Sequence, residues 1–147
     1  MKKVLLSTAM GAALLLGGFS ATGLATPSKA EAAGFEVQLT RSGYFSNYVA
    51  SKAYHQNYGK NVKTITLREG YIKSSSSVKG TYKVYIQTRK NNTGSWKTVK
   101  TITANKNGKT YFTSPKISKN DGYRFYSVNT GTKKKVTFYM SWIPWAN

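Results

Sequence analysis

In several short stretches of the chain, a basic residue precedes a tyrosine by two or four positions. They are Lys83-Val84-Tyr85, Lys109-Thr110-Tyr111, Arg124-Phe125-Tyr126 and the longer Lys135-Val136-Thr137-Phe138-Tyr139. In a β-strand, side chains two or four positions apart point to the same face. Lysine and arginine can hold phosphates or acidic sugars, while tyrosine rings pack on sugar planes and their hydroxyls donate hydrogen bonds. The pattern therefore predicts one sheet face that binds an anionic ligand.

A structural explanation competes with this prediction for each pair taken alone. Tyrosine favours the half-buried surface of a sheet, and lysine keeps sheet edges from aggregating. Repetition on several strands adds weight to the binding interpretation, and both stay open from the sequence. The predicted ligand-binding residues are Lys83, Tyr85, Arg89, Lys109, Tyr111, Arg124, Tyr126, Lys133, Lys135 and Tyr139.

The elements that position these residues are short β-rich runs separated by turn signals. We expect strands at 62–68, 82–89, 95–104, 109–113, 122–129 and 133–142, with a further one at 35–40. In the last run, Val136, Phe138, Met140 and Trp142 form an apolar row that predicts the core side. About seven short strands with regular turns indicate a single all-β domain, an antiparallel β-sandwich.

One turn, one longer segment and one tryptophan carry particular expectations. Asn107-Gly108 predicts a hairpin, because this dipeptide readily adopts the positive φ angles of a type I′ turn. The tyrosine-rich segment 41–62 does not alternate, and a short helix or an aromatic-rich loop are the two options for it. Trp145 follows Pro144, which favours a plug over one end of the sandwich, with an exposed aromatic contact as the alternative.

The first 33 residues have the layout of a secretory signal peptide. Lys2 and Lys3 precede an apolar run that ends at Phe19, and a polar stretch leads to Ala30-Glu31-Ala32. The secreted domain is therefore expected to span residues 34–147. With 0 cysteines in the chain, a lipid-modified cysteine and disulfides are both excluded. We expect a secreted, extracellular protein, and any attachment to the cell wall would be non-covalent.

The charge of the chain indicates its partners. Without Lys2, Lys3, Lys29 and Glu31, 20 of the 23 basic and three of the 4 acidic residues remain, a net charge near +17. Solubility alone needs a net charge of about 2 to 8 in a small domain. Such an excess attracts anionic polymers and membrane surfaces.

Residues for catalysis are scarce in the predicted domain. It contains one histidine, His55, and three acids, Glu36, Glu69 and Asp121. They show no spacing typical of a metal site, a nucleophile elbow or a phosphate loop, so no metal, no cofactor and no enzyme activity are expected. The one enzymatic alternative is a small basic nuclease, with Glu69 as general base and His55 as general acid.

The sequence thus favours a secreted cationic binding protein. Its expected partners are teichoic acid, acidic polysaccharide or an anionic membrane, with non-specific binding of nucleic acid also open. The alternative is a secreted antimicrobial or toxin-like protein that acts on bacterial envelopes through charge and interfacial aromatic residues. The oligomeric state does not follow from the sequence.

Overall fold

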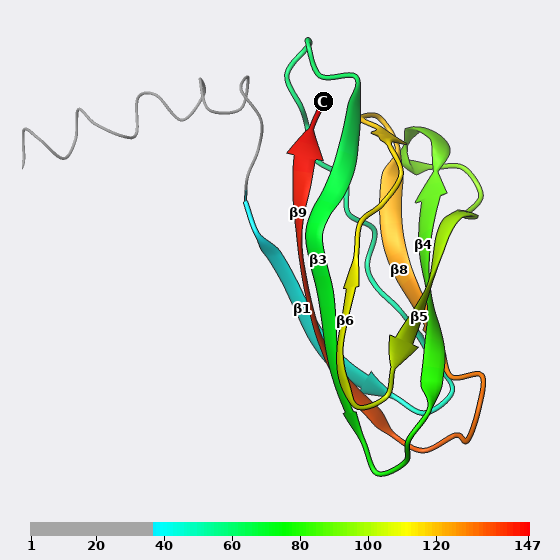
Figure 1. Ribbon diagram of the computed structural model, residues 1–147. Coiled ribbons are helices and arrows are strands. Elements are labelled where there is room, and N and C mark those ends of the chain that lie inside the picture. The colour runs from blue at the N-terminus through cyan, green and yellow to red at the C-terminus, as the bar shows by residue number, and fades with distance from the viewer. Residues whose placement is uncertain (1–36) are drawn as a thin grey trace, which may run out of the picture.

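The computed structural model describes residues 37–147, and the predicted signal peptide lies outside the described residues. Nine strands build this part of the chain (Figure 1). They are β1 (Leu39–Phe45), β2 (Tyr48–Ala50), β3 (Thr64–Ser76), β4 (Thr81–Arg89), β5 (Lys97–Asn105), β6 (Gly108–Phe112), β7 (Ile117–Ser118), β8 (Gly122–Val128) and β9 (Val136–Ala146). A short 3-10 turn at Lys90–Asn92 follows β4.

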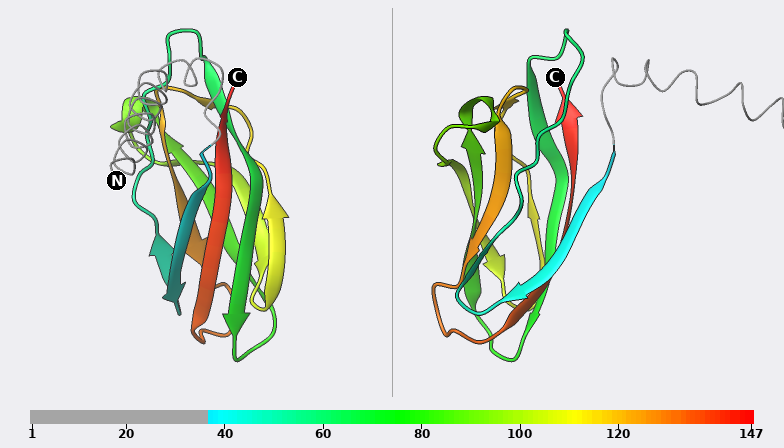
Figure 2. Two further views of the ribbon diagram at one scale, coloured as in Figure 1. Left: turned by 90° about the vertical axis from the view of Figure 1, so that its left-hand side faces the viewer. Right: turned by 180° about the vertical axis from the view of Figure 1, so that it is seen from behind.

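The strands form two antiparallel sheets that pack face to face, which confirms the predicted sandwich. Sheet A is 5-stranded, with the order β1-β9-β3-β6 and with β7 paired to β3. Sheet B is 4-stranded, with the order β2-β8-β4-β5. Figure 2 looks onto the face of sheet A in its left view and shows the two layers from behind in its right view. No helix within residues 37–147 is long and apolar enough to cross a membrane.

Alternate residues of the strands fill the space between the sheets, as the parity of the sequence predicts. Phe138 and Trp142 of β9 are buried in the row that was expected to be apolar. The rings of Phe125 and Trp142 meet at 4.7 Å between centroids, and the Trp142 indole Nε1 donates to the Tyr123 hydroxyl over 3.0 Å. Aromatic edge-to-face contacts of this kind add to the free energy gained by burying apolar area.

The segment before β3 contains strands and a strap, so the helix considered for residues 41–62 is wrong. Residues 41–45 lie in β1, and β2 follows after a two-residue turn. The strap, residues 51–63, runs up between the two sheets (Figure 2, right). Tyr54 forms an isolated bridge with Tyr123, and its ring lies 5.1 Å from that of Trp142. Burial on the strap raises the pKa of Tyr58 to about 12.

The Asn107-Gly108 turn does not make the predicted hairpin, because it carries the chain from sheet B to sheet A. Its flanking strands β5 and β6 pair with β4 and β3 respectively. Gly108 has a φ of 113°, and the Asn107 side chain bonds to a neighbouring turn instead. Asn107 Oδ1 accepts from Ser76 N over 2.8 Å, and its Nδ2 donates to the Val78 carbonyl over 3.0 Å.

Strand β3 continues beyond Arg68, where the sequence predicted its end. Glu69 and Gly70 form a bulge between Arg68 and Tyr71, and the φ of Glu69 is 50°. A side chain at Gly70 would place Cβ 2.5 Å from the Phe112 ring, so the absence of a side chain lets that ring pack on the backbone. Beyond the bulge, β3 presents Tyr71 and Lys73 to solvent on the same face.

Candidate binding faces

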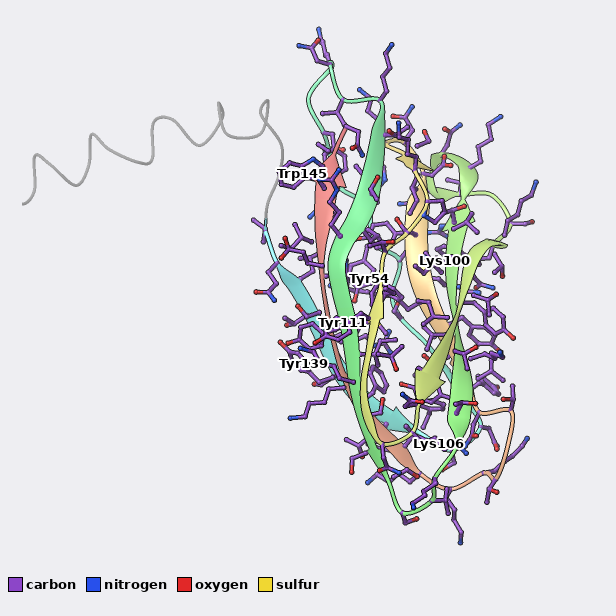
Figure 3. The ribbon with its side chains drawn as sticks, viewed as in Figure 1. Tyr54, Lys100, Lys106, Tyr111, Tyr139 and Trp145 are labelled. Carbon is purple, nitrogen blue, oxygen red and sulfur yellow. The ribbon has the colours of Figure 1, made fainter. Side chains whose placement is uncertain are left out.

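The structure divides the predicted basic-tyrosine residues between two faces, so the expectation of one face is wrong. Lys83, Tyr85, Arg89, Arg124 and Tyr126 lie on β4 and β8 of sheet B, whereas Lys109, Tyr111 and Tyr139 lie on β6 and β9 of sheet A. All of them point away from the shared core. Because the sheets pack through their inner faces, the two outer faces look in opposite directions (Figure 3).

The outer face of sheet B carries two arginines around a tryptophan. We call it the arginine face and define it by Tyr48, Lys83, Tyr85, Arg89, Trp96, Arg124 and Tyr126. The Cζ atoms of Arg124 and Arg89 lie 4.3 and 4.7 Å from the centre of the Trp96 ring. Arg124 Nε donates to Gln87 Oε1 over 2.9 Å, while Arg89 donates through two nitrogens to Asn92 Oδ1. Both guanidinium groups are therefore held in position before any ligand arrives.

Tyrosine rings continue the arginine face across three adjacent strands. Tyr85 of β4 and Tyr126 of β8 are directly opposite each other, with ring centroids 6.2 Å apart and planes inclined by 29°. Tyr48 of β2 lies 6.0 Å from Tyr126 and is 66% exposed. Lys83 lies two residues before Tyr85 on β4, and its Nζ donates to Thr103 Oγ1 over 2.7 Å. The result is a row of three tyrosines with cations along it, in which Tyr85 and Tyr126 stack on each other and the Tyr48 plane is tilted by 52° from that of Tyr126.

The outer face of sheet A carries lysines beside tyrosines, and one arginine, Arg68, which stacks on Trp145. We call it the lysine face and define it by Tyr44, Tyr71, Lys73, Lys109, Tyr111, Lys135 and Tyr139. Lys109 Nζ lies 4.0 Å from the ring centre of Tyr71 and 4.8 Å from that of Tyr111, which is 71% exposed. Tyr71 in turn lies 5.9 Å from Tyr139. Desolvation and the neighbouring Tyr71 phenol raise the pKa of Tyr139 above its ordinary value of 10.0, which by itself already leaves the hydroxyl neutral at physiological pH.

The remaining two predicted residues lie at one end of the molecule. Lys135 directly precedes β9, and its Nζ lies 4.5 Å from the ring centre of Tyr44 on the lysine face. Lys133 is exposed in the loop between β8 and β9 and belongs to neither face. Lys106, only 1% exposed, donates from Nζ to the Thr132 carbonyl over 2.8 Å. This buried lysine fixes the loop that carries Lys133.

Sequence reasoning missed several residues of both faces. Tyr44 and Tyr48 fall in the segment for which a helix or loop was expected, and Tyr71 and Lys73 fall beyond the predicted end of a strand. A signal for the latter pair was present, because Tyr71, Lys73 and Ser75 alternate with Ile72 and Ser74. Trp145 is also misplaced by the prediction of a plug. It lies in β9 opposite Thr66, with Arg68 Cζ 4.8 Å from its ring centre.

The two residues of the nuclease alternative lie on different elements, His55 on the strap and Glu69 in β3. His55 is exposed on the strap and lines a small hollow with Gln56, Asn57, Tyr58, Lys119 and Asn120, and Glu69 is not among the lining residues. Glu69 lies in the β3 bulge. Asp121 accepts a hydrogen bond from Asn91 N over 3.1 Å. In the described part of the chain, no three His, Cys, Asp or Glu side chains are grouped as a metal site would require.

The electrostatic environment of both faces is strongly positive. All 20 basic residues expected in the secreted domain lie within residues 37–147, where the only carboxylate side chains belong to Glu69 and Asp121. Glu69 lies in the β3 bulge, and Asp121 directly precedes β8. An anionic ligand would meet little side-chain repulsion on either side.

A scan against protein-family models found no matching family, and searches of the curated proteins and of the solved structures found no match to this chain.

Proposed function

We propose that this chain is an extracellular, non-enzymatic binding protein that attaches to anionic polymers such as teichoic acid or acidic polysaccharide. The observation that carries the proposal is the placement of held cations beside exposed phenol rings on both outer faces. Coulomb attraction supplies most of the affinity, and the rings and hydroxyls orient the polymer. The protein needs no cofactor for this activity.

The strand order supports a ligand-binding role for the cations over a role limited to preventing aggregation at the sheet edges. Sheets need lysine mainly on their edges, where unpaired backbone groups invite aggregation. Lys109 lies on the edge strand β6, so edge protection is enough to explain it. Lys83, Lys73 and Arg124 lie on the interior strands β4, β3 and β8, where both edges of the strand are already paired. Their presence there is better explained by a ligand.

The nature of the exposed aromatic groups favours a polymer over a membrane. The large exposed hydrophobic side chains in residues 37–147 are Val37, Val99 and four tyrosines, Tyr44, Tyr48, Tyr111 and Tyr139. Insertion into a bilayer relies on tryptophan, phenylalanine and leucine at the contact surface. Trp96 and Trp145 are each stacked with arginine instead.

The proposal is tested by co-sedimentation of the purified protein with a panel of partners. The panel holds bacterial cell walls before and after removal of teichoic acid, an immobilised polyuronate, anionic liposomes, DNA and a neutral polysaccharide. We expect retention on the acidic wall polymers or the polyuronate and little on the neutral polysaccharide. Retention on the neutral polysaccharide alone would contradict the proposal, and leakage of liposomes would favour the antimicrobial alternative.

His55→Ala provides the test against catalysis. We expect this variant to retain full polymer binding, because His55 lies on the strap and on neither face. DNA and RNA are incubated with both proteins, and the products are separated on a gel. The nuclease alternative would be correct if the wild type cleaves nucleic acid and His55→Ala does not, while the two proteins have the same melting temperature.

A further inference from the structure

We infer that the arginine face and the lysine face are two independent sites, so that one molecule bridges two chains of a pyranose-based acidic polysaccharide. The inference rests on the proposed function and names its polymer and its consequence. It follows from the division of the predicted residues between the two sheets of the sandwich.

The two faces are too well separated to form one site. Packed sheets are about 10 Å apart, and the outer side chains of each extend in opposite directions. A sugar on Tyr126 therefore has the core of the protein, including Phe125 and Phe138, between it and Tyr139. A short oligosaccharide on one face cannot contact the other. Two chains can be held at once without hindering each other.

The aromatic geometry favours a polymer made of rings. The Tyr85 and Tyr126 rings stack on each other with planes inclined by 29°, and the neighbouring Tyr48 ring, 66% exposed, offers an aromatic surface for the apolar face of a pyranose. The guanidinium of Arg124 lies 5.8 Å from the Tyr126 ring centre. Its bond to Gln87 uses Nε, so the terminal nitrogens are in position to donate a bidentate pair to a carboxylate beside a stacked sugar. A polyol phosphate chain has no ring that could pack on these tyrosines.

The lysine face offers the same pair of functions with different groups. Lys109 between the Tyr71 and Tyr111 rings supplies the cation, and the exposed ring of Tyr111 supplies the flat surface. Lys73 is adjacent to Lys109 across the β3–β6 pair. Lysine contributes a point charge, in contrast to the planar fork of arginine. We therefore expect this face to be the weaker and less selective of the two.

The test uses matched variants that disable one face each. Arg124→Gln with Tyr126→Ser removes one charge and one phenol from the arginine face, and Lys109→Gln with Tyr111→Ser does the same on the lysine face. Lys60→Gln serves as the control, because it removes one charge from the strap and leaves both faces unchanged. Melting temperatures establish that each variant is folded. Sedimentation velocity establishes that each is a monomer at the concentrations used.

The first readout is the binding stoichiometry of a short oligogalacturonate by calorimetry. We expect two oligosaccharides per wild-type or Lys60→Gln molecule and one per molecule of each face variant. A wild type that binds one would overturn the bridging inference while the proposed function stands. A wild type that binds neither the oligosaccharide nor any polymer of the panel would overturn both.

The second readout is capture of a second chain. Polygalacturonate is immobilised, the protein is bound and washed, and labelled oligogalacturonate is then added in solution. Wild type should retain the label, whereas each face variant should bind the surface and lose most of the label. Bivalent attachment should also make the wild type roughly 10²-fold slower to wash off than either variant. If poly(glycerol phosphate) competes as well as polygalacturonate at equal charge, the role assigned to ring stacking is wrong.

Discussion

Arg124 concentrates several interactions of the arginine face in one side chain. Its guanidinium stacks on Trp96, lies beside Tyr126 and donates to Gln87, so its orientation is fixed from three sides. An arginine held in this way loses little conformational entropy when a carboxylate binds. The strand parity that places Arg124 outward also places Phe125 in the core.

Adjacent residues of β9 provide a direct test of that parity. Phe138 is 4% exposed and packs against Phe45, whereas Tyr139 is 37% exposed on the lysine face. Phe138→Ala should lower the free energy of unfolding by about 3 to 5 kcal/mol, the usual cost of emptying a buried phenylalanine site. Tyr139→Ala should cost far less and weaken polymer binding, more so together with Lys135→Ala.

Denaturant unfolding measures the stability of these variants, and co-sedimentation with polyuronate measures their binding. Equal destabilisation by the two single variants would show that Tyr139 belongs to the core. Normal binding by Tyr139→Ala and by its combination with Lys135→Ala would remove Tyr139 from the binding surface.

Tyr58 on the strap should make the free energy of unfolding depend on pH. Burial raises its pKa from 10.0 to about 12, so the unfolded chain releases this proton at a lower pH than the folded protein does. Its contribution to stability is therefore complete below about pH 10 and is lost as the pH rises through about 12. Burial also raises the pKa of Tyr123, which adds a change of the same sign.

Tyr58→Phe isolates the contribution of the one phenol. Melting temperatures of the wild type and the variant are recorded from pH 8 to 12, and the wild type should lose stability relative to the variant as the pH rises, because only the wild type has the Tyr58 phenol to ionise. The variant retains Tyr123 and should still lose stability at high pH. Parallel curves over the whole range would show that Tyr58 is not buried as described.

At the scale of elements, the β3 bulge decides how far the lysine face extends. The shift between Arg68 and Tyr71 allows β3 to continue and to bring Tyr71 and Lys73 opposite β9 and β6. Gly70 is essential to this geometry because the Phe112 ring occupies the space of a side chain there. Without that glycine, β6 and the residues Lys109 and Tyr111 would have to move.

Gly70→Ala should therefore destabilise the fold by about 1 to 3 kcal/mol, the typical range for overpacking. Gly59→Ala is the matched control, because no atom lies within 4 Å of the Cβ it would add. Chemical denaturation of both variants provides the comparison. A Gly70→Ala protein as stable as Gly59→Ala would mean that the Phe112 ring does not rest on the bulge.

At the scale of the whole molecule, the charge surplus makes binding sensitive to salt. The Debye length falls from about 30 Å at 0.01 M to about 3 Å at 1 M ionic strength, so distant cations stop contributing first. We expect the affinity for polyuronate to fall at least about tenfold between 0.05 and 0.5 M salt, as counterion release requires for several contacts. Retention that does not change over this range would contradict binding through charge.

The sequence predicted the sandwich and the inward or outward direction of most strand residues, because parity is a local property. Phe125, Phe138 and Trp142 are buried as predicted, and Tyr85, Tyr126 and Tyr139 point outward. The competition between Tyr111 and Phe112 is resolved by packing, since Phe112 fits over Gly70 and leaves Tyr111 exposed.

The sequence could not predict which sheet each strand joins, because that depends on pairing between distant segments. The four basic-tyrosine runs look equivalent in one dimension, yet two of them lie on strands of sheet A and two on strands of sheet B. Local turn chemistry also gave the wrong answer at Asn107-Gly108, where the chain passes from sheet B to sheet A and Asn107 Oδ1 accepts a hydrogen bond from Ser76 N. Whether these faces bind remains a prediction.

The pairing of β1 with β9 also governs when the domain can form during synthesis. Leu39 pairs with Trp142, and the side chain of Gln38 donates to Ser141, 103 positions along the chain. A growing chain that has reached only residue 135 has no partner for β1 and lacks one neighbour of β3. Contacts so distant in sequence form late and slowly. Sheet A is therefore completed only when the last eleven-residue strand has been made, and every shorter chain remains open.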